Sequence, residues 1–210
     1  GTMLNSNAYV YNDGHERKKQ TFTAGNYMDY TYDDIGQLKT ARGKEAGGAS
    51  RWHEQFEYGY DAAWNLNSRA NYALTQTFNV NNLNELTTIG RSGTLTVAGG
   101  TSTNASSVTV KDNANPASAA ALYGDNTFAR TNVTLLNGNN TFTAIAEDAL
   151  GRRDTNTVTV NLPATVNCYY DVRGNLTCPR SVNKAKSYQF TIGRADCIIT
   201  GIAITTQTQG

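Results

Sequence analysis

Residues 58–66 read YGYDAAWNL, and this short pattern recurs along the chain. Residues 30–38 (YTYDDIGQL) carry a full second copy, and residues 169–176 (YYDVRGNL) carry a slightly shorter third one. Weaker copies lie at residues 9–14 (YVYNDG) and 78–86 (FNVNNLNEL). The shared pattern joins an aromatic segment to an Asp or Asn, a two-residue turn, a Gly or Asn, and then a Leu. Such repetition predicts a series of small strand–turn–strand units.

Each position of the pattern has a role in a hairpin. The Tyr-x-Tyr alternation places both rings on one face of a strand, where they can stack on the neighbouring unit. The Asp or Asn that follows can accept hydrogen bonds from the backbone of the turn, and the Gly or Asn tolerates a left-handed backbone. The Leu returns the chain to the apolar face. One unit is too small to bury this face alone, so several must lie side by side.

The motif resembles the YD repeats of the RHS family, whose units read approximately Y-x-Y-D-x-x-G-x-L. In that family many repeats spiral into a long β-sheet that can close into a shell, and polymorphic toxins and the teneurin cell-surface proteins use it. The resemblance implies a secreted or cell-surface location and a bacterial source. About five units are too few for a shell, so we do not expect this chain to enclose a cargo.

The spacing of the units indicates an insertion. The aligned positions Tyr11, Tyr32, Tyr60 and Val80 follow one another at intervals of about 20 to 28 residues. The next aligned position, Tyr170, comes only after about 90 residues. Subtracting one unit leaves about 70 residues, the size of one small sandwich domain. We therefore expect a second domain between two repeat units.

The inserted segment, residues 91–163, replaces the aromatic repeat with short strands rich in Thr and Val. Glycine- and asparagine-rich turns separate these strands, and the spacing is typical of a β-sandwich. The expected strands are residues 94–98, 107–110, 132–135, 141–146 and 157–161.

Residues 138–152 (GNNTFTAIAEDALGR), followed by TVTV at 157–160, resemble the last hairpin of bacterial Ig-like modules. Such modules are usually spacers, adhesion elements or carbohydrate-contacting accessories, and are rarely catalytic. Glu147 and Asp148 are adjacent on a strand, so their side chains point to opposite faces and cannot form a catalytic pair. We expect Asp148 to accept backbone hydrogen bonds in the hairpin turn.

The composition excludes several other classes of protein. With 18 Lys+Arg against 17 Asp+Glu, the net charge is +1, which argues against nucleic acid as a partner. No apolar run approaches the roughly 20 residues that span a bilayer. The 12 tyrosines and 19 glycines, with few helix-forming segments, favour β-strands and turns.

The three cysteines give no metal-binding pattern. Cys168 and Cys178 flank one hairpin-like segment, so a cross-strand disulfide is one possibility, and Cys197 stands apart. No CxxC pair is present and both histidines are distant, so neither a metal nor a cofactor is predicted. The tail after residue 177 follows neither repeat pattern, although Tyr188–Ile192 and Cys197–Thr205 are each predicted to form a strand.

Two sets of residues are candidates for chemistry. His15 and His53 are the only histidines, and a hydrolytic site at the junction of repeat sheet and sandwich would use one of them. Trp52, Tyr60 and Trp64 are candidates for ligand contact, because aromatic faces can stack on sugars. The regular aromatic spacing favours packing instead, but Trp64 replaces the Gly of the turn and is therefore the best candidate for an exposed contact.

The predicted fold class is all-β, an Ig-like β-sandwich inserted into a small YD-repeat β-hairpin sheet. Residues 1–90 form the repeat segment, 91–163 the sandwich, 164–177 a returning repeat unit and 178–210 a divergent tail. The predicted function is that of a non-catalytic structural or binding module from a larger protein. A hydrolase using His15 or His53 and a carbohydrate-binding module are the alternatives. Open sheet edges predict self-association, and a carbohydrate or protein partner is expected rather than nucleic acid.

Overall fold

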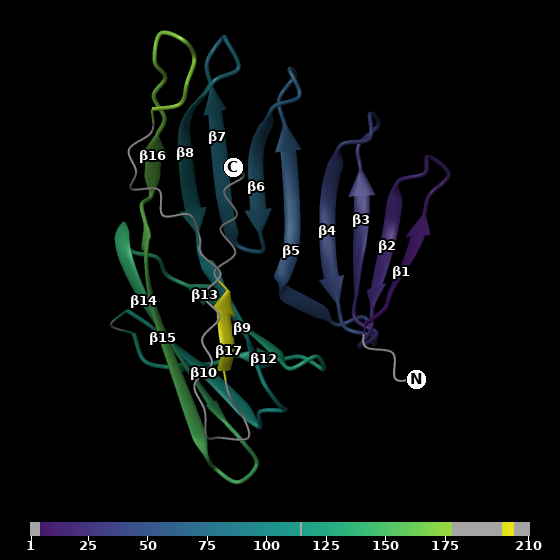
Figure 1. The fold of residues 1–210 in the computed structure, drawn as a ribbon, viewed down its shortest axis with the longest axis vertical. Helices are drawn as coiled ribbons and strands as arrows, with labels where there is room; N and C mark the ends of the chain where they lie inside the picture. The colour runs from purple at the N-terminus through teal and green to yellow at the C-terminus, as the bar shows by residue number, and fades with distance from the viewer. Residues whose placement is uncertain (1–4, 114, 178–198, 204–210) are drawn as a thin grey trace.

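The computed structural model describes residues 5–113, 115–177 and 199–203, and the regular elements in these ranges are all β-strands (Figure 1). The all-β fold class predicted from the sequence is therefore confirmed. These described ranges contain no helix with the length and apolar character needed to cross a membrane.

The first eight strands follow one another as antiparallel hairpins in one sheet of nine strands, which we call the hairpin sheet. Because each strand pairs with its neighbour in sequence, the sheet is built from local contacts. Its first eight strands are β1 (Asn7–Tyr11), β2 (Arg17–Phe22), β3 (Tyr27–Tyr32), β4 (Leu38–Lys44), β5 (Ser50–Tyr60), β6 (Leu66–Asn71), β7 (Leu74–Val80) and β8 (Leu86–Gly93).

The ninth strand, β16 (Thr165–Asn167), continues the hairpin sheet after a long detour of the chain. It pairs antiparallel with β8, and Val166 lies opposite Ile89. The chain therefore leaves the sheet after β8 and returns beside the same strand.

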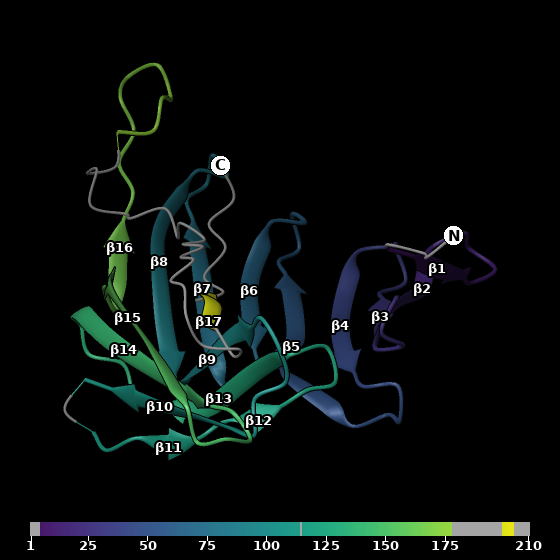
Figure 2. The ribbon, with the colours of Figure 1, turned by 60° about the horizontal axis from the view of Figure 1, so that its bottom comes forward.

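Strands β9 to β15, which lie between β8 and β16 in the chain, form with β17 a sandwich of two four-stranded sheets, placed under one end of the hairpin sheet (Figure 1 and Figure 2). One sheet has the order β11-β10-β14-β15, and the other has the order β12-β13-β9-β17. The strands are β9 (Leu95–Thr101), β10 (Ser107–Asp112), β11 (Ser118–Ala119), β12 (Ala121–Leu122), β13 (Thr127–Val133), β14 (Gly138–Glu147), β15 (Arg153–Leu162) and β17 (Ile199–Ala203).

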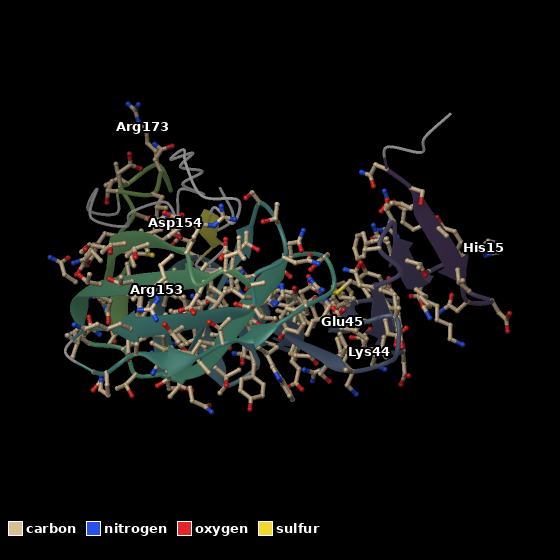
Figure 3. All side chains as sticks on the ribbon, turned by 90° about the horizontal axis from the view of Figure 1, so that it is seen from below. His15, Lys44, Glu45, Arg153, Asp154 and Arg173 are labelled. Atoms are coloured by element: carbon tan, nitrogen blue, oxygen red, sulfur yellow. The ribbon has the colours of Figure 1, made fainter. Side chains whose placement is uncertain are left out.

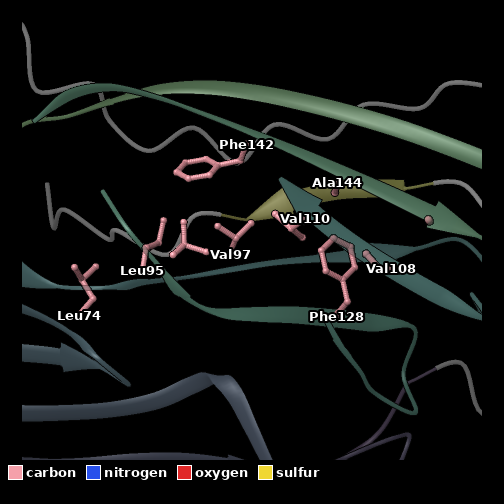
Figure 4. Close-up of a cluster of buried hydrophobic side chains, with 10 residues drawn as sticks. Leu74, Leu95, Val97, Val108, Val110, Phe128, Phe142 and Ala144 are labelled. Atoms are coloured by element: carbon pink, nitrogen blue, oxygen red, sulfur yellow. The ribbon is translucent and has the colours of Figure 1, made fainter. Parts of the chain in front are cut away.

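Alternating apolar residues of the two sandwich sheets form the hydrophobic core (Figure 4). Phe128 faces this core from one sheet and Phe142 from the other, and both are fully buried. Leu74 belongs to β7 of the hairpin sheet but packs in the same cluster. The two parts of the molecule therefore share one core at their junction.

Gly93, at the end of β8, allows the chain to pass into the sandwich. Its φ is +85°, and a Cβ at this position would lie 1.9 Å from the carbonyl oxygen of Ala73. The next residue, Thr94, donates its N–H to that same carbonyl (3.1 Å). Only glycine fits this crossing, because a side chain would collide with backbone.

One turn geometry recurs at the hairpin tips. In the β3–β4 turn, Asp33 Oδ1 accepts hydrogen bonds from the N–H groups of Ile35 (3.1 Å) and Gln37 (2.8 Å). In the backbone of this turn, the first residue donates its N–H to the carbonyl of the fifth residue, and its own carbonyl accepts from the N–H of the fourth. The same two backbone bonds recur in turns that begin at Asn12, Asp61, Asn81, Asp148 and Asp171. The fourth residue of each turn has positive φ, and these residues are His15, Gly36, Trp64, Asn84, Gly151 and Gly174. This is a type I turn followed by a left-handed residue.

The role expected for Asp148 in the β14–β15 turn is confirmed. Asp148 Oδ1 accepts from the N–H groups of Leu150 (2.9 Å) and Arg152 (3.0 Å). Glu147 instead forms an ion pair with Arg153 at 2.7 Å.

Two strand predictions have different outcomes. The strand expected at residues 132–135 is present with wrong bounds, because β13 runs from Thr127 to Val133 and buries Phe128 and Ala129, which precede the expected start. The strand expected at Cys197–Thr205 is present as β17, which pairs with β9. The strand expected at Tyr188–Ile192 lies outside the described residues, as do Cys178 and Cys197, while Cys168 is buried.

Candidate functional site

Two neighbouring hairpin tips, those of β3–β4 and β5–β6, enclose a groove of about 330 Å³ that we call the Trp64 groove. Aromatic walls with a few polar groups are usual for small-ligand sites. The lining residues are Asp33, Ile35, Gln37, Lys39, Tyr58, Gly59, Tyr60, Asp61, Ala62 and Trp64.

Trp64 occupies the left-handed position of the β5–β6 turn. Its φ is +67° and 69% of its surface is exposed, so little packing offsets the strain. A left-handed conformation costs an L-residue about 1–2 kcal/mol, and glycine escapes this cost. Asp61 holds the turn in place, because its Oδ1 accepts from the N–H groups of Ala63 and Asn65, both at 2.9 Å. Hydrogen bonds from Asn65 hold the pKa of Asp61 below its ordinary value.

Tyr58 and Tyr60 line the groove from β5, two residues apart and therefore on one face of the strand. The Tyr60 hydroxyl donates to the carbonyl oxygen of Leu38 (3.1 Å). Burial raises the pKa of both phenols, and for Tyr60 the neighbouring Tyr58 and Asp33 raise it further. Both hydroxyls therefore stay protonated at neutral pH.

Three polar side chains complete the groove. Asp33 uses Oδ1 in its own turn, and its Oδ2 has no hydrogen bond within the described residues. The Gln37 side-chain amide and the Lys39 ammonium group also make no hydrogen bond there. The groove thus offers both acceptors and donors beside its aromatic rings.

A second cluster lies where the hairpin sheet meets the sandwich. Arg51 of β5 has a side chain that is only 1% exposed. Its Nε donates to Glu54 Oε2 (2.8 Å), its Nη2 to Asp125 Oδ2 (2.8 Å), and its Nη1 to Glu45. Asp125 precedes β13, so this ion pair joins the two parts of the molecule. We call these four residues the Arg51 cluster.

Ion pairing sets the charge states in the Arg51 cluster. Burial opposes ionisation of each group, but the hydrogen bonds between them outweigh it. Bonds from Arg51 and Thr127 hold the pKa of Asp125 below its ordinary value, and bonds from His53 and Arg51 do the same for Glu54. The pKa of Arg51 is raised by its bonds to Asp125 and Glu54. Asp125, Glu54 and Arg51 are therefore all charged at neutral pH.

His53 lies beside this cluster at the junction. Its Nε2 is 3.4 Å from Glu54 Oε1, and its ring centroid is 5.3 Å from that of Tyr123. Its Nδ1 is buried and has no hydrogen-bond partner among the residues that the structure describes. Glu54 can reach this position because it crosses Gly43, where a Cβ would lie 2.4 Å from the Glu54 Cβ.

His15 lies in the β1–β2 turn, where it takes the left-handed position with φ of +63°. Figure 3 shows it at the far end of the hairpin sheet from the sandwich, whereas Glu45 lies at the boundary between the two parts. The structure therefore places His53, and not His15, at the junction, and it keeps the two histidines apart.

The candidate aromatic residues fall into two places. Tyr60 and Trp64 both line the Trp64 groove. Trp52 is instead packed against Tyr72, with ring centroids 5.0 Å apart, and 38% of it is exposed. Its backbone N–H donates to the hydroxyl of Tyr123 (2.9 Å) at the junction.

Sequence reasoning missed the polar side of the groove and the whole Arg51 cluster. Arg51 stands in a strand with no motif around it, so no sequence signal marked it. Gln37 and Lys39 follow the Asp33 turn, and they line the same groove as Tyr58 and Tyr60 because β4 pairs with β5. Among the described residues, no group of three or more His, Cys, Asp or Glu side chains is placed to hold a metal ion.

Two of the solved structures that match this chain give low structural similarity. One, the crystal structure of TcdB2-TccC3-Cdc42, matches 79% of this chain with 14% sequence identity and a TM-score of 0.38. The other, TcdB2-TccC3-TEV, matches 81% with 15% identity and a TM-score of 0.37. In each case this chain spans 8% of the matched chain. No family model and no curated protein matches the sequence.

Proposed function

We propose that this chain is a non-catalytic structural module of a larger bacterial protein of the RHS/YD-repeat type, secreted or held at the cell surface. In this proposal the repeat segment, residues 1–90 and 164–177, supplies the sheet, and residues 91–163 supply an Ig-like sandwich that β17 completes and that the sheet carries. The observation that carries the proposal is the pairing of β16 with β8, which continues the sheet across the insertion.

The attachment of the sandwich supports this role. The shared core at Leu74 and the Arg51 cluster join the two parts at separate points. Buried ion pairs demand good geometry, so the cluster favours one orientation of the sandwich over others. A sheet that holds a domain in a fixed orientation is suited to presenting that domain to a partner.

The edges of the hairpin sheet supply the expected contacts with neighbours. β1 and β16 are the end strands among the described residues, so each has one edge without a paired strand. Tyr9, Val10 and Tyr11 of β1 are all exposed. Unpaired strand edges with exposed apolar residues tend to add further strands. Neighbouring repeat units, or a second copy of this chain, are the partners that these edges fit.

Sedimentation velocity over a range of protein concentrations tests the proposal. We expect reversible self-association that weakens when Val10→Lys places a charge on the β1 edge. Leu150→Lys is the matched control, because Leu150 is also exposed and apolar but lies in the β14–β15 turn. A wild-type protein that stays monomeric at every concentration would contradict the proposed role of the edges.

Carbohydrate binding in the Trp64 groove is a second candidate function, and one observation favours it. Trp64 is strained and exposed at a turn position that Gly36 takes in the β3–β4 turn and Asn84 takes in the β7–β8 turn. Strain of this kind is concentrated at functional sites. A glycan array followed by titration tests it, with Trp64→Gly expected to abolish binding and Trp52→Phe to retain it. Absence of binding across the array would remove this candidate.

A further inference from the structure

Four side chains lie in a row across the middle of the hairpin sheet. Tyr58 of β5 pairs with Arg69 of β6, Arg69 pairs with Gln76 of β7, and Gln76 pairs with Arg91 of β8. Directly paired residues of antiparallel strands project to the same face of a sheet. We call Tyr58, Arg69, Gln76 and Arg91 the donor row.

The row has more free hydrogen-bond donors than free acceptors, because the carbonyl oxygen of Gln76 is already used. Arg69 donates from Nε (3.2 Å) and Nη2 to Gln76 Oε1, which uses the carbonyl oxygen of that amide. Arg69 Nη1, the Gln76 amide nitrogen and the Tyr58 hydroxyl have no hydrogen bond within the described residues. Burial raises the pKa of Tyr58, so its hydroxyl keeps its proton.

The positive charge of the row is also uncompensated. Burial lowers the pKa of Arg69 and of Arg91, and no carboxylate among the described residues offsets this effect for either one. Arg91 directs its Nε and Nη2 to backbone carbonyls rather than to an acid. A half-buried guanidinium without an anion is costly, and a bound oxyanion would relieve that cost.

We propose that the donor row binds an oxyanion, with Arg69 as its main ligand. The planar guanidinium suits a carboxylate or phosphate group, and the Tyr58 hydroxyl and Gln76 amide lie on either side of it. A cationic ligand would be repelled by the guanidinium and would leave these donors unpaired. The test rests on Arg69, which lines neither the Trp64 groove nor the junction, so its failure is distinguishable from failure of the structural role or of carbohydrate binding.

Nuclear magnetic resonance of the arginine Nε–H groups tests the proposal directly. The whole chain is titrated with inorganic phosphate in one arm and with acetate in the other, at constant ionic strength. We expect a saturable shift of the Arg69 signal in at least one arm, and the arm with the tighter response identifies the source of the oxyanion.

Variants separate this site from general salt effects. Arg69→Gln should weaken anion binding at least tenfold, judged by the saturable rise in melting temperature that a bound ligand causes. Arg42→Gln is the matched control, because Arg42 already pairs with Glu57, and it should keep the wild-type response. Equal responses in the two variants, or no saturable response in the wild type, would overturn the proposal. Circular dichroism checks that both variants are folded.

Discussion

Arg91 Nε donates a hydrogen bond to the carbonyl oxygen of Pro163 at 3.1 Å. Arg91 stands where the chain leaves the hairpin sheet, and Pro163 stands where it returns, 72 positions later in the sequence. The Nη2 group of the same arginine donates to the carbonyls of Leu136 and Leu162, both at 2.6 Å. One side chain therefore fixes both ends of the sandwich, which keeps β16 beside β8.

Replacing Arg91 should loosen this attachment. In Arg91→Met, three carbonyl oxygens lose their donor, and each unsatisfied partner costs about 1–3 kcal/mol where it is buried and less where water can reach it. We expect the free energy of unfolding in urea to fall by about 1–3 kcal/mol in total. Arg153→Met is the control, because its pair with Glu147 is exposed, and it should change stability by less than about 0.5 kcal/mol. Equal effects of the two substitutions would contradict this role of Arg91.

The Arg51 cluster should contribute more to the free energy of unfolding than the hydrogen bonds of Arg91 do. Arg51→Met leaves the carboxylates of Glu54 and Asp125 without their cation, and breaking a buried ion pair costs about 3–5 kcal/mol. Arg42→Met removes a surface pair with Glu57, for which about 0–1 kcal/mol is expected. Urea denaturation of both variants measures the difference. A loss in Arg51→Met no larger than that in Arg42→Met would show that the cluster does not hold the junction.

Acid should release the same junction. The pKa values of Asp125 and Glu54 are lowered in the folded protein. Their contribution to stability is complete above the ordinary carboxyl pKa of about 4, and it is lost as the pH falls through the lower folded values. Unfolding free energy measured from pH 7 down to pH 2.5 should therefore fall more steeply in the wild type than in Arg51→Met. Parallel pH profiles are the result that this account does not allow.

Trp64→Gly should stabilise the protein. Glycine adopts the φ of +67° found at this position without strain, and relief of a left-handed conformation is worth about 1 kcal/mol. Trp64→Ala removes the same ring but keeps a Cβ, so it should gain less. Melting temperatures of the wild type, Trp64→Gly and Trp64→Ala rank their stabilities. If the Gly and Ala variants at position 64 are equally stable, relief of backbone strain does not explain their change in stability.

The turns could be predicted from the sequence because their chemistry is local. Asp33, Asp61 and Asp171 bond to backbone groups two and four residues ahead, and this spacing is visible in the motif. The interval between Val80 and Tyr170 likewise indicates a long detour between repeat units, and the chain does leave the hairpin sheet after β8 and return at β16. The start of β13 was misplaced, because burial of Phe128 rather than Thr/Val alternation determines where that strand begins.

The sites could be predicted only in part. Trp64 was recognisable because it departs from the glycine of the pattern, whereas its groove depends on the neighbouring β3–β4 tip. Arg51 meets Asp125 across 74 positions of sequence, and no local pattern records such a contact. The donor row depends on strand register, which the hairpin turns determine and a linear motif does not show.

The central claim is that the sandwich interrupts the sequence of the hairpin sheet but not the sheet itself. Cross-strand nuclear Overhauser effects between the backbones of Ile89 and Val166 test it most directly, because these residues are paired between β8 and β16. The pair Phe78 and Ile89, within the β7–β8 hairpin, is the internal control. We predict contacts for both pairs in the intact chain. Contacts for Phe78 and Ile89 with none between Ile89 and Val166 would contradict the claim.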